Sequence, residues 1–134
     1  MSRLIDSSIW ISIVRTPKAS ADCEVLRRIV NHPQACLCEP VLFEVTRGAP
    51  KHRQGQLTEY LDTTPVFPTP PSLWQDAVRL GQKCRAKNFH PSAMDLLIAT
   101  IAMAHGATLV SLDGDFTKLS KVGGFEFERV KLKG

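Results

Sequence analysis

Short apolar runs and longer helical patterns alternate along the chain. The runs at 3–5, 36–38 and 107–112 end abruptly at polar residues, which predicts three buried strands. Residues 125–130 alternate between apolar and charged side chains, as in a strand near the edge of a sheet. The proline-rich stretch 64–72 leaves room for one further short strand. We therefore expect about five strands.

Helical spacing fills the segments between these strands. The predicted helices cover residues 9–14, 21–31, 40–47, 51–61, 73–87, 92–105 and 116–119. Pro40 suits the first turn of its helix, Ser92 suits a helix start, and Gly106 suits a helix end. Strands that alternate with helices predict an α/β fold, a mainly parallel sheet flanked by helices on both faces. Trp10 and Trp74 fall on apolar helix faces, so we expect them in the core or in a dimer interface.

Length and composition add modest constraints. The chain has 134 residues, which suits a single domain over residues 1–134. Seventeen Lys and Arg against thirteen Asp and Glu give a net charge of +4, which permits a polyanionic partner without requiring one. No apolar run is long enough for a membrane span, and we expect neither a signal peptide nor an anchor. The four cysteines lack zinc-ligand spacing, so we expect free thiols in a reducing, cytoplasmic setting.

Carboxylates follow the predicted strands. Ligands of open α/β sheets bind at the carboxyl ends of the strands, which makes Asp6, Glu44, Asp95, Asp113 and Asp115 the residues of interest. Each also has a purely structural interpretation. Asp6 could only cap the helix that follows, Asp95 completes a capping-box pattern with the serine three positions earlier, and Asp113 and Asp115 could form a simple turn.

Taken together, these carboxylates favour a metal site. Acidic groups that converge in a cleft repel one another, and a cation relieves that repulsion. Hard oxygen ligands without His or Cys favour Mg²⁺ or Mn²⁺ over zinc. Such an ion can activate a water and stabilise charge on a phosphodiester.

Four segments also resemble one known family. They are Leu4-Ile5-Asp6-Ser7-Ser8-Ile9-Trp10-Ile11, Phe43-Glu44-Val45-Thr46-Arg47-Gly48, Asp95 to Ala102, and Thr108 to Phe116. In this order, they resemble the motifs of PIN-domain nucleases, and more narrowly those of VapC-type toxins of toxin–antitoxin pairs. The resemblance implies a PIN-like three-layer fold.

The resemblance also implies roles for individual residues. It makes Asp6, Glu44, Asp95 and Asp113 the catalytic acidic residues, with Asp6, Asp95 and Asp113 as the metal ligands. Hydroxyls at Ser8 and Ser111 match residues that support this site, and Asp115 is either a further supporting residue or the fourth carboxylate in place of Asp113. Leu112 departs from the pattern, because many members have Asn there.

The leading hypothesis is therefore a Mg²⁺- or Mn²⁺-dependent endoribonuclease, the toxin of a toxin–antitoxin system. The resemblance further implies a homodimer, an RNA substrate and a cognate antitoxin. The alternative is a PIN-like RNA- or protein-binding module with little or no cleavage, which the presence of all four carboxylates disfavours. A haloacid-dehalogenase-like phosphohydrolase would need Asp-x-Asp after the first strand, and Asp6-Ser7-Ser8 lacks the second Asp.

Overall fold

A parallel sheet forms the centre of the molecule. The computed structural model describes residues 1–134. Its strands are β1 (Arg3–Ile5), β2 (Ala35–Cys36), β3 (Thr108–Ser111) and β4 (Phe127–Arg129). They lie in the order β2-β1-β3-β4, and every neighbouring pair is parallel. The predicted α/β class is confirmed, and the last strand lies at the sheet edge as expected.

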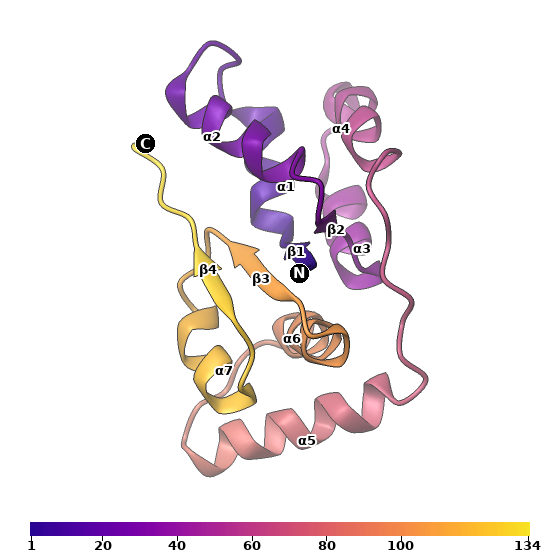
Figure 1. The fold of residues 1–134 in the computed structure, drawn as a ribbon, viewed down its shortest axis with the longest axis vertical. Helices are drawn as coiled ribbons and strands as arrows, with labels where there is room; N and C mark the ends of the chain where they lie inside the picture. Colours follow the sequence, from indigo (N-terminus) through magenta and orange to yellow (C-terminus); the bar gives the residue numbers. More distant parts are fainter.

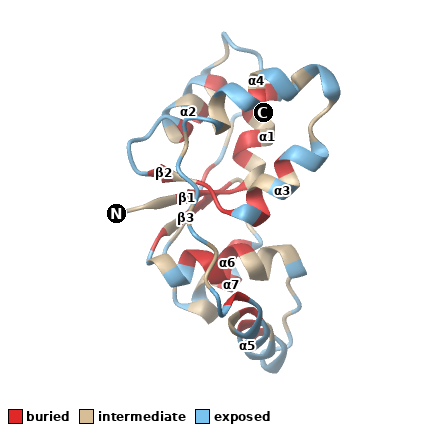
Figure 2. Cartoon of the chain, turned by 90° about the vertical axis from the view of Figure 1, so that its right-hand side faces the viewer, coloured by how far each residue is buried: buried red, intermediate tan, exposed pale blue.

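Helices cover both faces of this sheet. They are α1 (Ser7–Arg15), α2 (Ala21–Val30), α3 (Glu39–Gly48), α4 (Gln54–Leu61), α5 (Leu73–Ala86), α6 (Ala93–His105) and α7 (Phe116–Gly123), with a 3₁₀ turn at Lys51–Arg53. Helices α1–α4 lie on one side of the strands and α5–α7 on the other (Figures 1 and 2). Buried residues concentrate on the strands and on the helix faces turned toward them (Figure 2). No helix is both long and apolar enough to span a membrane.

The proline-rich segment contributes only a single bridge to the sheet. Leu37 pairs with Val66 in parallel, and the Leu37 N–H donates to the Pro65 carbonyl over 2.8 Å. Prolines at 65, 68, 70 and 71 have no N–H to donate, so the ladder cannot extend. The strand expected there is therefore reduced to one residue.

The two tryptophans differ in burial. Trp10 is fully buried, and its Nε1–H donates to the Ile5 carbonyl over 3.0 Å. This bond ties α1 to the end of β1, immediately before Asp6. Trp74 is 68% exposed at the start of α5, so it is not a core residue.

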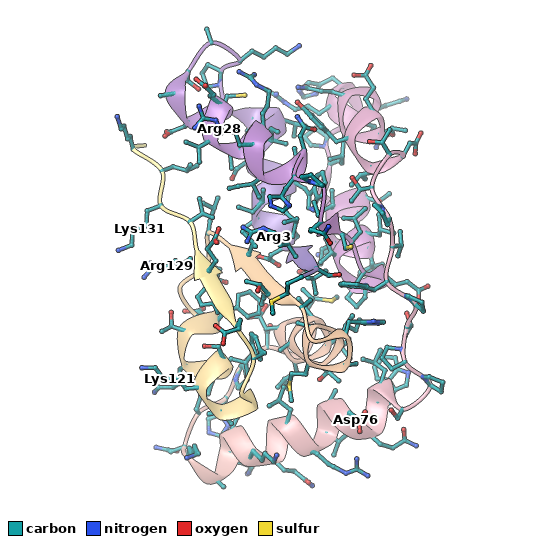
Figure 3. All side chains as sticks on the ribbon, in the orientation of Figure 1. Arg3, Arg28, Asp76, Lys121, Arg129 and Lys131 are labelled. Atoms are coloured by element: carbon teal, nitrogen blue, oxygen red, sulfur yellow. The ribbon has the colours of Figure 1, made fainter.

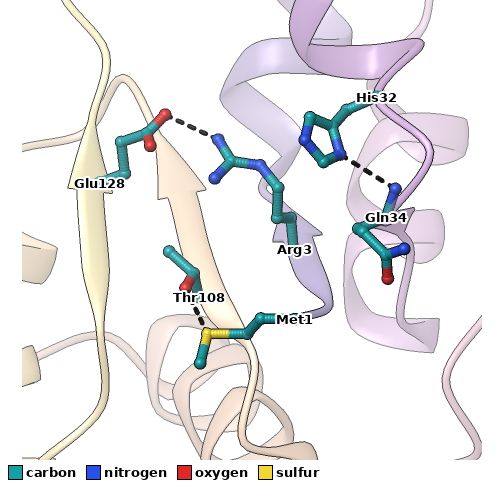
Figure 4. Close-up of polar contacts among 6 residues, drawn as sticks. All are labelled: Met1, Arg3, His32, Gln34, Thr108 and Glu128. Atoms are coloured by element: carbon teal, nitrogen blue, oxygen red, sulfur yellow. Dashed lines mark hydrogen bonds and ion pairs between the residues drawn. The ribbon is translucent and has the colours of Figure 1, made fainter.

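An ion pair links the first strand to the edge strand. Arg3 of β1 reaches Glu128 of β4 over 2.7 Å, passing across β3 (Figure 4). Near it, the Gln34 N–H donates to His32 Nδ1 over 2.9 Å, which orders the turn into β2. Arg3 is the first residue of β1, so this pair lies away from the carboxyl end of the strand.

Candidate active site

The expected acidic residues lie at the end of the sheet where the carboxyl ends of β1 and β3 meet. Asp6 directly follows β1, and Asp113 follows β3 by two residues. Glu44 lies in the second turn of α3, and Asp95 lies in the first turn of α6. Asp6 is buried, whereas Glu44, Asp95 and Asp113 are half-buried. Three of the four side chains are therefore partly accessible to solvent, and Asp6 lies beneath the surface.

Hydroxyls and a helix terminus hold Asp6 in place. Its Oδ2 accepts hydrogen bonds from Ser111 Oγ at 2.6 Å and from Ser8 Oγ at 3.0 Å. The Ser8 N–H also donates to Oδ2 over 3.4 Å, so Asp6 does cap α1. Only one weak contact, from Ser7 Oγ at 3.5 Å, reaches Oδ1. The capping role thus occupies one oxygen and leaves the other available to a ligand.

The two serines expected to support the site connect its two strands. Ser8 Oγ and Ser111 Oγ lie 3.1 Å apart. Ser8 Oγ accepts the Leu112 N–H over 3.1 Å, and Ser111 Oγ accepts the Asp113 N–H over 2.9 Å. These bonds fix the backbone after β3 relative to Asp6. The apolar Leu112 side chain packs against the core, so its contribution here is its backbone N–H.

Ser7 also belongs to this network, a role that the sequence pattern alone does not predict. Its Oγ donates to Glu44 Oε1 over 3.0 Å and joins α1 to α3. Burial and the charge of Asp6 raise the pKa of Glu44, while the Ser7 hydrogen bond and Arg47 lower it. A hydroxyl directly after Asp6 is the only feature of the sequence that marks Ser7. Its partner Glu44 lies 37 residues away, so the hydrogen bond depends on how the helices pack.

Asp95 is the carboxylate whose pKa is shifted most by its surroundings. Ser92 Oγ accepts the Asp95 N–H over 3.1 Å, so Ser92 caps α6 as expected. The pKa of Asp95 is raised from 3.8 to about 6. Burial is the largest cause, followed by the negative charges of Asp6, Asp113 and Glu44. Burial and repulsion by the neighbouring carboxylates therefore disfavour the ionised form of Asp95, an effect that a role in helix capping does not explain.

The turn after β3 distinguishes its two aspartates. Asp113 Oδ1 accepts the Asp115 N–H over 2.9 Å, an Asx turn that orients Asp113. Asp115 is exposed, and its side chain makes no capping hydrogen bond to α7. Asp113 contributes to the raised pKa of Asp95, and Asp115 is not among its causes. This geometry favours Asp113 over Asp115 as the fourth carboxylate.

The donor set suits a hard divalent cation. Every candidate ligand is a carboxylate oxygen, the preferred ligand type of Mg²⁺ and Mn²⁺. The side chains do not already converge: no group of three or more Asp, Glu, His or Cys residues is close enough to hold a metal ion. Like-charge repulsion favours such separation. Binding a cation would therefore require the carboxylates to move closer together.

The thiol nearest this site is chemically quiet. Cys38 is fully buried at the start of α3, and its pKa is raised to about 12. Burial is the main cause, and the charges of Asp6, Glu44 and Glu39 add to it. A thiol of this kind stays protonated and is a poor nucleophile or metal ligand. All four cysteines are free, as expected.

Comparison with known proteins identifies the family. The model of the PIN domain family matches residues 3–122. The chain belongs to the PIN domain family. It is 30% identical over 130 residues to VapC ribonuclease Mb1587 of Mycobacterium bovis and to ribonuclease VapC11 of Mycobacterium tuberculosis, covering 89% of this chain and 92% of each relative.

Solved structures share the PIN-like fold. VapBC2 from Rickettsia felis, bound to a DNA fragment from its promoter, matches with a TM-score of 0.79 at 19% identity, over 98% of this chain and 100% of that one. DNA-bound VapBC from Salmonella typhimurium matches with a TM-score of 0.77 at 15% identity, over 96% and 98%. The three-layer PIN-like architecture expected from the sequence is confirmed.

Proposed function

We propose that this PIN domain is an endoribonuclease that hydrolyses RNA phosphodiesters with a divalent cation, Mg²⁺ or Mn²⁺. The observation that carries this proposal is the placement of four carboxylates around the ends of β1 and β3. Burial, followed by the charges of Asp6, Asp113 and Glu44, raises the pKa of Asp95 there. A site of this charge and oxygen content suits a cation. The 30% identity to VapC ribonucleases supports the substrate class.

Some of these residues would bind the cation, and others hold the ligands in position. We assign Asp6, Asp95 and Asp113 as the cation ligands, and Glu44 as a fourth carboxylate that orients a water or accepts its proton. Ser8 and Ser111 hold Asp6 and the backbone after β3 in place. A bound cation would activate water and offset charge that develops on the phosphate.

A protein antitoxin is the proposed partner. Structural neighbours include VapBC complexes and a toxin–antitoxin complex from Klebsiella pneumoniae. We therefore propose that this chain acts as the toxin of such a pair. We also propose a cytoplasmic location, which the four free thiols support.

A second copy of the chain is the proposed occupant of an apolar surface beside the site. Exposed apolar residues gather on α3 and α5, where Phe43 is 57%, Trp74 68% and Val78 58% exposed. A groove of about 450 Å³ between α3, α5 and α6 is lined largely by apolar side chains, Phe43 and Trp74 among them. Exposed apolar patches of this kind commonly mark protein interfaces.

RNA cleavage by the purified, partner-free protein tests the proposed activity. Total cellular RNA is incubated with Mg²⁺, with Mn²⁺ or with EDTA, beside the Asp95→Asn variant. We expect discrete cleavage with metal, none with EDTA, and a loss of at least about 100-fold in rate for the variant. Cleavage that persists in EDTA, or in the variant, would contradict the proposal.

A further inference from the structure

Arg129 ends the edge strand beside the carboxylate site. It is the last residue of β4 and pairs in parallel register with Ser111, the residue that holds Asp6. The Val130 N–H donates to the Ser111 carbonyl over 2.8 Å, which fixes this register. Arg129 is exposed and projects from the sheet edge (Figure 3). The strand register therefore places an accessible cation level with the acidic site.

The Arg129 guanidinium lies directly on Gly114. A Cβ atom placed on Gly114 would be 2.6 Å from Arg129 Cζ and 2.8 and 2.9 Å from its two terminal nitrogens. Gly114 separates Asp113 from Asp115, so the cation sits over the turn between these carboxylates. Arg129 forms no ion pair within 4.0 Å. The ion pairs of the chain are Arg3–Glu128, Arg28–Glu24 and Arg79–Asp76. The guanidinium donors thus remain free for a ligand.

Three lysines lie around α7, the helix that follows the turn at Gly114. Lys87 at the end of α5 and Lys118 and Lys121 of α7 line a hollow of about 210 Å³. None of them forms an ion pair, and Lys118 Nζ lies 5.2 Å from the centre of the Phe89 ring. Helix α7 begins directly after Asp115, and Lys121 projects on the same side of the molecule as Arg129 (Figure 3).

We propose that Arg129 and the lysine hollow bind the phosphodiester backbone of a single-stranded RNA beside the carboxylate site. This inference rests on the proposed ribonuclease function. A planar guanidinium can grip a phosphate through two parallel hydrogen bonds, whereas lysines attract phosphates as point charges. Backbone contacts of this kind set the position of a nucleic acid without reading its sequence. Arg129 is thus a positioning residue that holds a phosphate close to Asp113.

Gly114 provides an indirect way to move Arg129. Its φ is not positive, unlike those of Gly106, Gly124 and Gly134, so alanine suits its backbone conformation. The atoms that an alanine methyl would meet belong to the Arg129 guanidinium. Gly114→Ala should therefore displace the guanidinium while the turn keeps its shape.

Binding of a labelled single-stranded oligoribonucleotide of mixed sequence tests the inference. All variants are made in the Asp95→Asn protein, which prevents cleavage, and affinity is measured across a salt series in Mg²⁺. We expect Arg129→Ala to weaken binding about fivefold and to reduce the slope of log affinity against log salt by about 0.7, the value for one phosphate contact on a single strand. Lys118→Gln with Lys121→Gln should reduce the slope further. Lys18→Gln, an exposed lysine between α1 and α2, is the charge-matched control and should have a smaller effect.

The double variant separates a local contact from a general charge effect. Gly114→Ala alone should weaken binding, but it should have no further effect when Arg129 is already alanine. Additive losses of affinity from Gly114→Ala and Arg129→Ala would overturn the inference. An Arg129→Ala affinity equal to that of the Lys18→Gln control would do the same. The cationic surface would then be assigned to an acidic protein partner. Failure of the nuclease itself is distinguishable, because RNA cleavage by the unmodified protein is measured separately. RNA that binds through Arg129 without being cut would contradict only the proposed activity.

Discussion

Asp95 is the residue whose environment departs most from that of an ordinary surface carboxylate. Its pKa of about 6 reflects burial and three negative neighbours, even though it also lies in a helix first turn that favours negative charge. A sequence pattern of Ser92 followed by an acidic residue three positions later indicates helix capping, and Ser92 does cap α6. The same residue also belongs to the acidic site. The two interpretations of the sequence are therefore compatible.

The raised pKa predicts how stability depends on pH. In the folded protein Asp95 holds its proton up to about pH 6, whereas in the unfolded chain it releases the proton near 3.8. The folded state thus binds more protons between these values, and the free energy of unfolding falls as pH rises through that window. Above about pH 6 the ionised Asp95 lowers the free energy of unfolding by about 1 kcal/mol, after solvent screening is allowed for. Glu44 acts in the same direction, because its pKa is also raised.

Thermal unfolding of Asp95→Asn in EDTA measures this contribution. The variant removes the charge and keeps the size, so its Tm near pH 7.5 should exceed that of the unmodified protein by about 3 °C. The difference should shrink as the pH is lowered toward 4. A Tm that falls on substitution at pH 7.5 would show that Asp95 stabilises α6 and is not under strain from its neighbours.

At the scale of elements, the start of α1 organises the site. Asp6 caps this helix, Ser8 accepts the backbone N–H after β3, and Ser7 reaches Glu44 on α3. Trp10 anchors the same helix to β1. Three successive residues at the start of this helix therefore connect it to β3 and to α3, and Trp10 connects it to β1.

Substitution of Ser7 tests the link between α1 and α3. Ser7→Ala removes the hydrogen bond that lowers the pKa of Glu44 and releases that side chain. We expect Mn²⁺ affinity to fall about tenfold, as is usual when a residue that orients a ligand is lost, with a change in unfolding free energy of about 1 kcal/mol or less. Ser12→Ala in the same helix is the control, because its hydroxyl makes no hydrogen bond to the site. Equal affinities for the two variants would contradict a positioning role for Ser7.

Periodicity predicted most of these elements, and the reasons for its failures are physical. Apolar runs that end at polar residues located β1 and β3, and with them Asp6 and Asp113. The segment around Val66 failed as a strand, because its prolines cannot donate to a ladder. Contacts between distant segments, such as Ser7 with Glu44 or Arg129 with Gly114, depend on helix packing and strand register. A local pattern does not contain that information.

At the scale of the whole molecule, the exposed apolar surface on α3 and α5 lies beside the acidic site. Trp74 illustrates the limit of helical periodicity, which predicts an apolar face without distinguishing the core from an interface. We expect the purified protein to sediment at twice the 14.8 kDa chain mass. Trp74→Ala should shift it toward the monomer, while Val25→Ala, an exposed apolar residue of α2, should not. A monomeric unmodified protein at micromolar concentration would contradict the homodimer.

Calorimetric titration with Mn²⁺ measures whether the carboxylates at the carboxyl ends of β1 and β3, together with Asp95, hold a cation. The partner-free protein at pH 7.5 should bind Mn²⁺ in competition with Mg²⁺. Asp95→Asn should weaken this binding at least about tenfold, and lowering the pH through 6 should weaken it in the unmodified protein, since the cation and the proton compete for Asp95. Absence of Mn²⁺ binding by the folded protein, or equal binding by the variant, would contradict a cation site formed by these carboxylates.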